Sequence, residues 1–306
     1  MPFAVTILGS NSAIPVYGRH HTAQHLHIQN HHFLLDCGEG TQLRLQEFGL
    51  KAQRLEAIFI SHLHGDHYLG LMGLLSSLHL QGRTKEIHLF GPPQLSEILT
   101  IQLRYSDTTF RYPLHFHPLT MAGGEVIYEN KKITVTTLAL QHRIPCVGFV
   151  FAEKPHPFRL NKDRLPAGIK PGEIALLKKG EDVPDGHGGT KYAANDMTLG
   201  RRKARSYAYC TDTLYLPELA ESIKGVDMLY HEATFLTEKE LKATKTYHAT
   251  AGQAAQLARD AGVQTLLLGH FSARYKDLAP LEEEARKIFP RSYLALEGET
   301  FNINNG

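Results

Sequence analysis

The stretch FISHLHGDH, residues 59–67, follows a run typical of a buried strand and places four metal-ligand side chains within six residues. His62 and His64 are two residues apart, so an extended chain points both side chains the same way. The glycine that follows permits a turn, after which Asp66 and His67 face a second position at the start of a helix. Two metal ions about 3.5–4 Å apart need ligand sets this close together, and imidazole with carboxylate suits catalytic zinc. The stretch therefore predicts a hydrolytic centre with two metal ions.

Around this stretch, strand-like and helix-like segments alternate along the chain. Strands are expected at Phe3–Leu8, Gln24–Ile28, His32–Asp36, Ala57–Ile60, Glu86–Phe90, Val126–Glu129, Lys132–Leu138, Val147–Phe151, Ser206–Cys210, Asp227–His231, Thr265–Gly269 and Tyr293–Leu296. Helices are expected at Thr41–Phe48, Tyr68–Leu80, Pro93–Ser106, Thr250–Ala258 and Leu278–Ile288. Strands interleaved with helices predict an α/β (α+β) protein whose sheets are covered by helices. Both halves repeat the order strand, polar loop with His or Asp, helix, which hints at an internal pseudo-repeat.

The composition bounds the protein class. The chain has 306 residues, 42% of them apolar, which is enough for one large domain with an insertion. The net charge of +2 excludes a uniformly basic coat, so a polyanion site must be local. The first residues, MPFAVTILGS, lack the pattern of a secretory signal, and no apolar run reaches the roughly 18 residues of a membrane span. We expect no contact with a membrane.

The cysteines and histidines carry further expectations. The three cysteines, Cys37, Cys146 and Cys210, are far apart and odd in number, so we expect no disulfide framework and a cytoplasmic protein. Most of the 19 histidines have no clear ligand role, and six are expected at the surface: His20, His21, His25, His27, His31 and His32. Cys210 lies two residues before Asp212 and is interpreted as a small buried residue rather than a ligand.

The string HxHxDH is the signature of the metallo-β-lactamase superfamily, and the whole chain resembles its ribonuclease Z (tRNase Z, short form) group. Further motifs of this group occur along the chain in the group's order. One precedes HxHxDH, LLDCGEGTQ at 34–42, and three follow it: ALQHRIPCVGF at 139–149, YCTDT at 209–213 and GHFSARY at 269–275. The resemblance implies an αββα four-layer sandwich. It assigns His62, His64 and His142 to one zinc ion and Asp66, His67 and His270 to the other, with Asp212 shared and Asp36 as a support. A lone histidine such as His142 would otherwise be an ordinary satisfied or exposed side chain.

Two more strings narrow the resemblance to this group. The string YHEATF at 230–235 contains the group's HEAT motif, and His248-Ala249-Thr250 resembles its partner motif. By resemblance Asp66 is both a ligand and the proton acceptor for the attacking water. His248, oriented by Glu232, protonates the leaving oxygen. For the second string, a helix that simply begins after a Thr250 cap is the plainer alternative.

These features predict a zinc-dependent endoribonuclease that removes the 3′ trailer from precursor tRNA. The tRNA keeps a 3′-hydroxyl and the trailer a 5′-phosphate. Two Zn²⁺ ions per subunit are expected, with Mn²⁺ or Fe²⁺ as alternatives. The alternative function is a phosphodiesterase or arylsulfatase of the same fold acting on another ester. A non-catalytic RNA-binding protein would be expected to lack some ligands, and a β-CASP-type nuclease would carry a larger inserted domain.

The stretch 153–205 differs in composition from the rest of the chain. It contains five prolines and twelve Lys and Arg against seven Asp and Glu, a net charge of +5, which leaves −3 for the remainder. A solvated loop is the plainer interpretation. By resemblance the stretch is instead an inserted flexible arm that binds tRNA, with Lys170, Lys178 and Lys179 as candidate contacts. Because such arms act across a symmetric pair, we expect a homodimer.

One loop departs from the pattern of the group. Many members carry a PxKxRN loop after the first strand, linked to sensing the CCA end of tRNA. The corresponding residues here are PVYGRH at 15–20, so Pro15 and Arg19 are present while the Lys and Asn are replaced. Arg19 is therefore expected to contact the substrate, but discrimination against tRNA that already ends in CCA does not follow.

Overall fold

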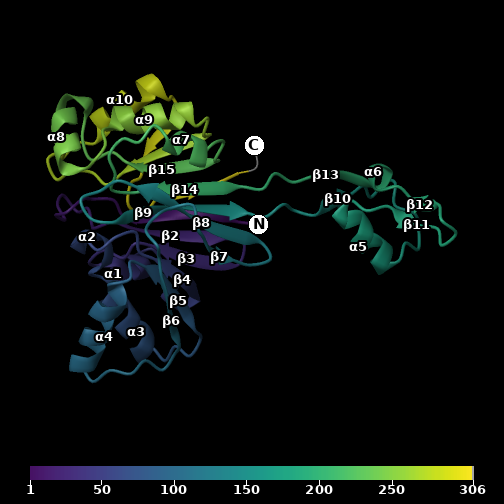
Figure 1. Ribbon diagram of the computed structural model, residues 1–306, viewed down its shortest axis with the longest axis horizontal. Coiled ribbons are helices and arrows are strands. Elements are labelled where there is room, and N and C mark those ends of the chain that lie inside the picture. The colour runs from purple at the N-terminus through teal and green to yellow at the C-terminus, as the bar shows by residue number, and fades with distance from the viewer. Residues whose placement is uncertain (305–306) are drawn as a thin grey trace.

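Two seven-stranded sheets stack face to face in the computed structural model, which describes residues 1–304 (Figure 1). The first sheet has the order β18-β1-β2-β3-β4-β5-β6. Its strands are β1 (Phe3–Gly9), β2 (Ala23–Ile28), β3 (His31–Leu35), β4 (Leu55–Phe59), β5 (Ile87–Gly91), β6 (Leu114–Pro118) and β18 (Thr300–Asn302). The second sheet has the order β17-β16-β15-β14-β9-β8-β7. Its strands are β7 (Val126–Glu129), β8 (Ile133–Leu140), β9 (Cys146–Glu153), β14 (Ser206–Cys210), β15 (Met228–Glu232), β16 (Thr265–Gly269) and β17 (Ser292–Leu294).

Helices cover the outer face of each sheet. The first sheet carries α1 (Thr41–Glu47), α2 (Gly65–Tyr68), α3 (Leu71–Leu80) and α4 (Leu95–Tyr105), and the second carries α7 (Leu219–Ser222), α8 (Glu240–Thr246), α9 (Ala251–Asp260) and α10 (Ala279–Ile288) (Figure 1). Short 3-10 helices are η1 (Ala52–Arg54) and η2 (Thr237–Lys239). The order helix, sheet, sheet, helix confirms the expected four-layer αββα sandwich.

The core between the sheets follows from the period of two along each strand. Alternate residues point inward, and large side chains such as Phe33, Phe59, Phe149 and Tyr209 meet there with no exposed surface. On the outer face small residues let a helix approach closely. The N-terminus of α9 is capped by Thr250, which forms a capping box with Gln253, and its alanines pack onto β15 and β16. Thr250 is therefore a helix cap, and this role leaves the prediction for His248 untouched.

The topology brings several strand ends to one edge. The strands β3 to β6 run parallel in the first sheet, and β14 to β17 run parallel in the second. The loops that follow β4, β14, β15 and β16 therefore meet at the same edge of the sandwich. The turn between β8 and β9 joins them there, since Val147 bonds through its backbone to Ser61. This edge holds the residues of the candidate site.

Some expected elements differ from the structure. The helix predicted over Tyr68–Leu80 is broken into α2 and α3, and α2 begins three residues earlier. At the break the N–H of Gly70 donates to the carbonyl of Cys37 at 3.0 Å instead of continuing the helix, and a Cβ at this close approach would lie 2.1 Å from the carbonyl oxygen of Gly38. The short strand β18, which pairs with β1, and the helices α7 and α8 were not expected from the pattern.

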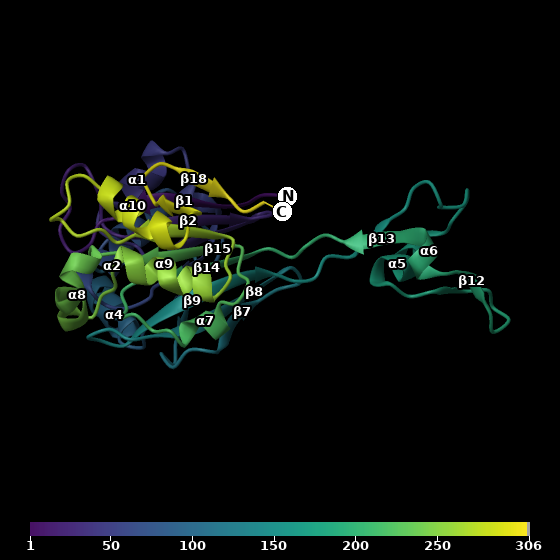
Figure 2. The ribbon, with the colours of Figure 1, turned by 90° about the horizontal axis from the view of Figure 1, so that it is seen from above.

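The stretch 153–205 forms a small folded unit on two connecting segments, which hold it away from the body (Figure 1, Figure 2). It contains β10 (Phe158–Leu160) paired with β13 (Thr198–Arg201), β11 (Val183–Pro184) paired with β12 (Thr190–Tyr192), α5 (Pro171–Lys179) and α6 (Ala194–Met197). Leu177, Val183 and Ala194 form a core of its own. The segment is therefore more than a solvated loop, while its flexibility stays a prediction.

The histidine and cysteine expectations have mixed outcomes. The surface prediction is wrong for His21 and His25, which are buried, and the other four histidines of that group are half-buried. Burial first, and then the neighbouring His32, lowers the pKa of His25 to about 3. All three cysteines are free and buried, Cys210 included. Within residues 1–304, no helix has the length and apolar character needed to cross a bilayer.

Candidate metal centre

The first of two ligand groups gathers at the ends of β4, β8 and β14. His62 Nε2 lies 3.2 Å from His64 Nδ1, and His142 Nε2 lies 3.0 Å from the same His64 atom. Asp212 Oδ2 is 3.7 Å from His62 Nε2 and 3.6 Å from His142 Nε2. His142 is oriented from behind, because its Nδ1 donates to the carbonyl of Tyr247 at 2.9 Å. Four donor atoms thus face one point.

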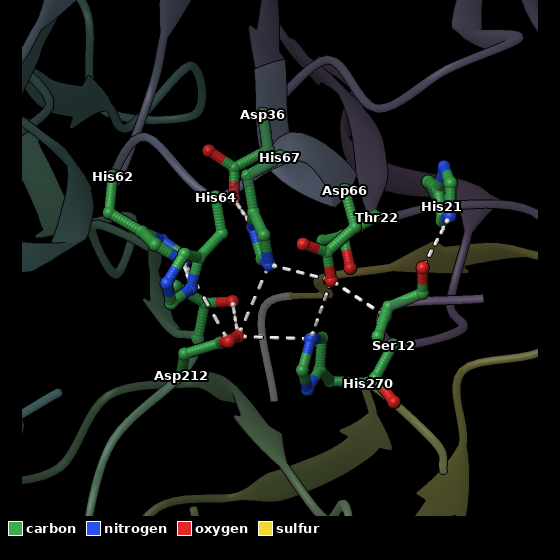
Figure 3. A network of polar contacts seen from close by, with 12 residues as sticks. Ser12, His21, Thr22, Asp36, His62, His64, Asp66, His67, Asp212 and His270 are labelled. Atoms are coloured by element: carbon green, nitrogen blue, oxygen red, sulfur yellow. Dashed lines mark hydrogen bonds and ion pairs between the residues drawn. The ribbon is translucent and has the colours of Figure 1, made fainter. Parts of the chain in front are cut away.

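The second group lies beside the first and shares one residue with it (Figure 3). His67 Nε2 is 3.6 Å from Asp66 Oδ2 and 3.3 Å from Asp212 Oδ1. His270 Nε2 is 3.5 Å from Asp66 Oδ2 and 3.1 Å from Asp212 Oδ1. Asp212 therefore turns one carboxylate oxygen to each group. The structure brings together all seven residues that the sequence nominated as ligands.

The donor sets fit two divalent cations. Ligand atoms about 2.0–2.2 Å from a tetrahedral ion lie roughly 3.3 Å from one another, close to the spacings found here. The Nε2 atoms of His67 and His270 are buried without a hydrogen-bond partner, as expected of atoms that point at an ion. Burial opposes the charged form of His67, yet Asp212, Asp66 and Asp36 outweigh it and raise its pKa well above the usual value. The buried centre thus carries an excess of negative charge that cations would balance.

Asp36 supports the second group from behind. Its Oδ2 accepts from Nδ1 of His67 at 2.7 Å, from the hydroxyl of Tyr209 at 2.7 Å and from that of Ser61 at 2.9 Å, while Oδ1 accepts from the backbone N–H of Ser61 at 2.8 Å. The bond to Nδ1 leaves Nε2 of His67 facing the centre. Such partners fix the tautomer and ring orientation of a ligating histidine.

A second buried carboxylate, Glu232, holds the residues on the other side of the centre. Its Oε1 lies 2.9 Å from Nδ1 of His248, and its Oε2 accepts from Thr234 at 2.6 Å. The Thr234 hydroxyl in turn lies 2.9 Å from Nδ1 of His270. Burial disfavours a charged His248, but Glu232 outweighs it and raises the pKa of His248 to about 9, so this imidazole carries a proton at neutral pH.

The cavity in front of these groups has a volume of about 450 Å³. It is lined by Ser12, Ala13, His21, His64, Gly65, Asp66, Leu69, His142, Arg143, Asp212, Thr246, His248 and His270. Cys146 is not among them. Its sulfur lies 3.6 Å from His62 Nδ1, on the far side of the ring, and burial raises the pKa of this thiol, so it stays protonated. The cavity leaves the ligand groups accessible to a small substrate group.

The loop after β1 borders this cavity. The backbone N–H of Ala13 donates to Asp66 Oδ2 at 2.8 Å. Arg19 closes the loop, because its Nε donates to Asn11 Oδ1 at 2.8 Å and its Nη2 to the carbonyl of Tyr275 at 2.6 Å. Part of the Arg19 guanidinium is thus engaged with the protein, and its contact with substrate stays a prediction.

The expected arm residues lie far from the centre. Lys170 precedes α5, and Lys178 and Lys179 occupy the last turn of that helix, all exposed. Three residues of the centre were not predicted from the sequence as site residues: Thr234, Arg143 and Tyr209. Thr234 lies inside the HEAT string, Arg143 lies next to a ligand and Tyr209 is the first residue of YCTDT, so each had a signal in the sequence.

Comparison with known proteins agrees with this geometry. A family model described as beta-lactamase superfamily domain matches residues 185–271, and one described as anti-Pycsar protein Apyc1 matches residues 3–156. A ribonuclease Z of Cytophaga hutchinsonii is 48% identical over 305 residues, which cover 100% of this chain and 97% of that protein. The chain belongs to the ribonuclease Z family. A second ribonuclease Z, from Bacteroides fragilis, is 45% identical over 96% of this chain and 97% of its own length.

Two solved structures with lower sequence identity share the fold of this chain. The human tRNase Z, short form, has a TM-score of 0.71 at 24% identity and covers 98% of this chain and 99% of its own. The metallo-beta-lactamase fold protein YhfI of Bacillus subtilis has a TM-score of 0.69 at 18% identity over 99% of this chain and 100% of its own. The metallo-β-lactamase fold expected from the HxHxDH string is confirmed.

Proposed function

We propose that this protein is a metal-dependent endoribonuclease that removes the 3′ trailer from precursor tRNA. The observation that carries the proposal is the pair of ligand groups that share Asp212, in a chain 48% identical over its whole length to a ribonuclease Z. The Glu232–His248 pair beside the ligands supplies the proton donor that an alcohol leaving group needs.

The cofactor of this proposal is two Zn²⁺ ions per subunit. His62, His64 and His142 would hold one ion, and Asp66, His67 and His270 the other, with Asp212 between them. Nitrogen and oxygen donors without a thiolate also suit Mn²⁺ or Fe²⁺, which remain alternatives. When bound, such ions act as Lewis acids that lower the pKa of a water molecule and offset the charge of the phosphate.

The protein's own residues then move two protons. Asp66, whose Oδ2 accepts from the backbone N–H of Ala13 at 2.8 Å, accepts the proton of the attacking water. The new bond joins the water oxygen to phosphorus, and the bond to the 3′ oxygen of the tRNA breaks. His248, held by Glu232, gives its proton to that oxygen. The tRNA therefore ends in a 3′-hydroxyl and the trailer begins with a 5′-phosphate.

The arm, 153–205, is proposed to bind the tRNA body through its backbone charge. Exposed Lys170, Lys178 and Lys179 are its candidate contacts, with Arg19 as a candidate contact near the centre. A double-stranded RNA is recognised mainly by its shape and phosphates, which suits a charged projection without a deep cleft.

A homodimer is proposed because the arm and the metal centre lie at opposite ends of the body (Figure 1, Figure 2). The strand β9 begins beside His62 and ends at the arm, and its eight residues span roughly 25 Å. The arm is thus separated from the centre of the same chain. In a two-fold dimer, one subunit would hold the tRNA that the other cuts. A cytoplasmic location is proposed from the three free cysteines.

One digest tests this function. Purified protein loaded with Zn²⁺ is incubated with a 3′-extended precursor tRNA, and the ends of both products are mapped. A single cut after the acceptor stem, with a 3′-hydroxyl and a 5′-phosphate, is the expected result. An intact precursor, together with rapid hydrolysis of a small phosphodiester or an aryl sulfate, would instead favour the alternative of a phosphodiesterase or arylsulfatase.

A further inference from the structure

A second cavity, of about 220 Å³, lies where the two connecting segments of the arm leave the body. It is lined by Met1, His156, Pro157, Arg159, Arg202 and Arg205. The lining thus contains three arginines and a histidine, and none of the acidic residues in the described part of the chain contributes to it. The metal centre lies at the other end of β9, so this cavity is separate from the site described above.

One of these arginines is fixed and balanced by the fold. Arg205 is buried, and its Nε and Nη2 donate to the two carboxylate oxygens of Glu153 at 2.9 and 2.7 Å, while Nη1 donates to the carbonyl of Ile303 at 3.0 Å. His156 Nε2 also lies 3.2 Å from Glu153. Glu153, which does not line the cavity itself, therefore fixes Arg205 and His156 and offsets the charge of Arg205.

The other two arginines have no such compensation. Arg159 and Arg202 are exposed, Arg159 donates to the backbone carbonyl of Gly200 at 3.1 Å, and neither forms an ion pair within residues 1–304. The nearby lysines of the same connecting segments differ. Lys154 pairs with Glu129 at 2.5 Å, and Lys203 pairs with Asp227. Two exposed arginines without an ion pair to any described residue therefore line the cavity, while Lys154 and Lys203 beside it are paired.

We propose that this cavity binds a phosphate group, and that the group belongs to the backbone of an RNA bound along the arm. Guanidinium groups match the geometry of a phosphate through paired N–H donors, and Arg159 and Arg202 have donors to spare. The cavity, at about 220 Å³, has room for a phosphate group. RNA is favoured over free phosphate because the cavity opens at the root of a segment with net charge +5. The RNA part of the inference rests on the function proposed above.

The test compares two double variants with the same loss of charge. Arg159→Gln with Arg202→Gln removes the uncompensated cations of the cavity, whereas Arg104→Gln with Arg111→Gln removes two exposed arginines of the body, outside the arm. Affinity for a 3′-extended precursor tRNA is measured by fluorescence anisotropy over a range of salt concentrations. We expect the cavity variant to bind about tenfold more weakly, with a salt slope smaller by about 1–2, as when one or two phosphate contacts are lost. The control should change less than threefold.

Equal weakening of both variants would show diffuse charge attraction and overturn the proposal. A second measurement separates the two sources of phosphate. If inorganic phosphate binds the wild-type protein in calorimetry and not the cavity variant, while both bind tRNA equally, the site takes free phosphate and the RNA assignment is wrong. Because binding is measured without cleavage, the two proposals can fail separately. A protein that binds precursor tRNA through this cavity but does not cut it after the acceptor stem would refute the proposed function and leave this inference standing. Thermal unfolding of each variant checks that the arm remains folded.

Discussion

A single carboxylate, Glu232, organises the side of the centre that faces the leaving group. It is fully buried and reaches His248 directly and His270 through Thr234. The same residue therefore fixes a proposed proton donor and a proposed ligand. Because Glu232 contacts both, the HEAT string and His248 act together in this proposal, although Glu232 and His248 are 16 residues apart in the chain.

The role of His248 can be separated from the role of the ligands by the choice of leaving group. We expect His248→Ala to lower kcat for precursor tRNA by about 10²–10⁴-fold, since the departing 3′ alkoxide needs a proton. Hydrolysis of bis(p-nitrophenyl) phosphate should fall far less, because p-nitrophenolate leaves without one. Asp66→Ala is the contrasting variant and should abolish both reactions. An equal loss on both substrates after His248→Ala would contradict a donor role.

Two buried tyrosines between the sheets, Tyr209 and Tyr207, allow a test of how Asp36 supports the ligand His67. The hydroxyl of Tyr209 donates to Asp36, whereas that of Tyr207 donates to Gln24 on the same inner face. We expect Tyr209→Phe to weaken zinc binding at the Asp66, His67 and His270 group by about tenfold, because the carboxylate that orients His67 loses a partner. Tyr207→Phe, its matched control, should not change zinc affinity. Competition with a chromophoric chelator measures both, and equal affinities in the two variants would exclude this role for Tyr209.

At the scale of elements, local sequence patterns predicted the bounds of several strands, and the elements that they missed have physical explanations. The strands Val126–Glu129, Ser206–Cys210 and Thr265–Gly269 have the predicted bounds, since β-branched, aromatic and leucine-rich runs end at polar loops. The single helix predicted over Tyr68–Leu80 is broken at Gly70, whose N–H bonds to the carbonyl of Cys37, a contact between segments 33 residues apart that the local pattern does not reveal. The strand β18 exists only through its pairing with β1, which no local pattern reveals.

The candidate site shows the same division. The HxHxDH string marked four of the seven ligand residues, and the resemblance to the ribonuclease Z group assigned His142, Asp212 and His270, each of which follows a strand that ends at the same edge of the sandwich. The bond from Tyr209 to Asp36 depends on how the two sheets stack, and the fold of the arm depends on a core of only three buried residues. Neither follows from spacing along the chain.

The arm as an element should affect binding and not chemistry. We expect deletion of residues 160–200 to raise KM for precursor tRNA by at least tenfold, because the exposed cations that neutralise phosphates are lost. The rate on bis(p-nitrophenyl) phosphate, which reaches only the cavity at the metal centre, serves as the readout for the chemistry and should persist. A parallel loss on both substrates would show that the arm supports the fold of the centre rather than the substrate.

The root of the arm contributes stability that depends on pH. Burial opposes ionisation of Glu153, but its hydrogen bonds to Arg205 and Gln29 prevail and lower its pKa to about 2. A lowered carboxyl pKa stabilises the fold above the unfolded value near 4.3, and this contribution is lost as the pH falls towards 2. We expect Glu153→Gln to reduce the free energy of unfolding by about 3 kcal/mol at pH 7 and by less at each step towards pH 3. A difference from wild type that stays constant over this range would contradict the assignment.

For the whole molecule, the proposed homodimer, with the arm of one subunit serving the centre of the other, predicts complementation between subunits. A chain without residues 160–200 keeps its centre, and a chain with Asp66→Ala keeps its arm. Each homodimer should process precursor tRNA poorly. The dimer without arms binds the substrate weakly, and the Asp66→Ala dimer does not catalyse the cleavage. Co-expressed as a mixed dimer, the two chains should recover one complete combination of arm and centre, and we expect about half the wild-type rate for that dimer. Purification through a different tag on each chain isolates it. If each arm served its own centre, the mixed dimer would contain no complete unit, and its rate would not exceed the sum of the two inactive halves.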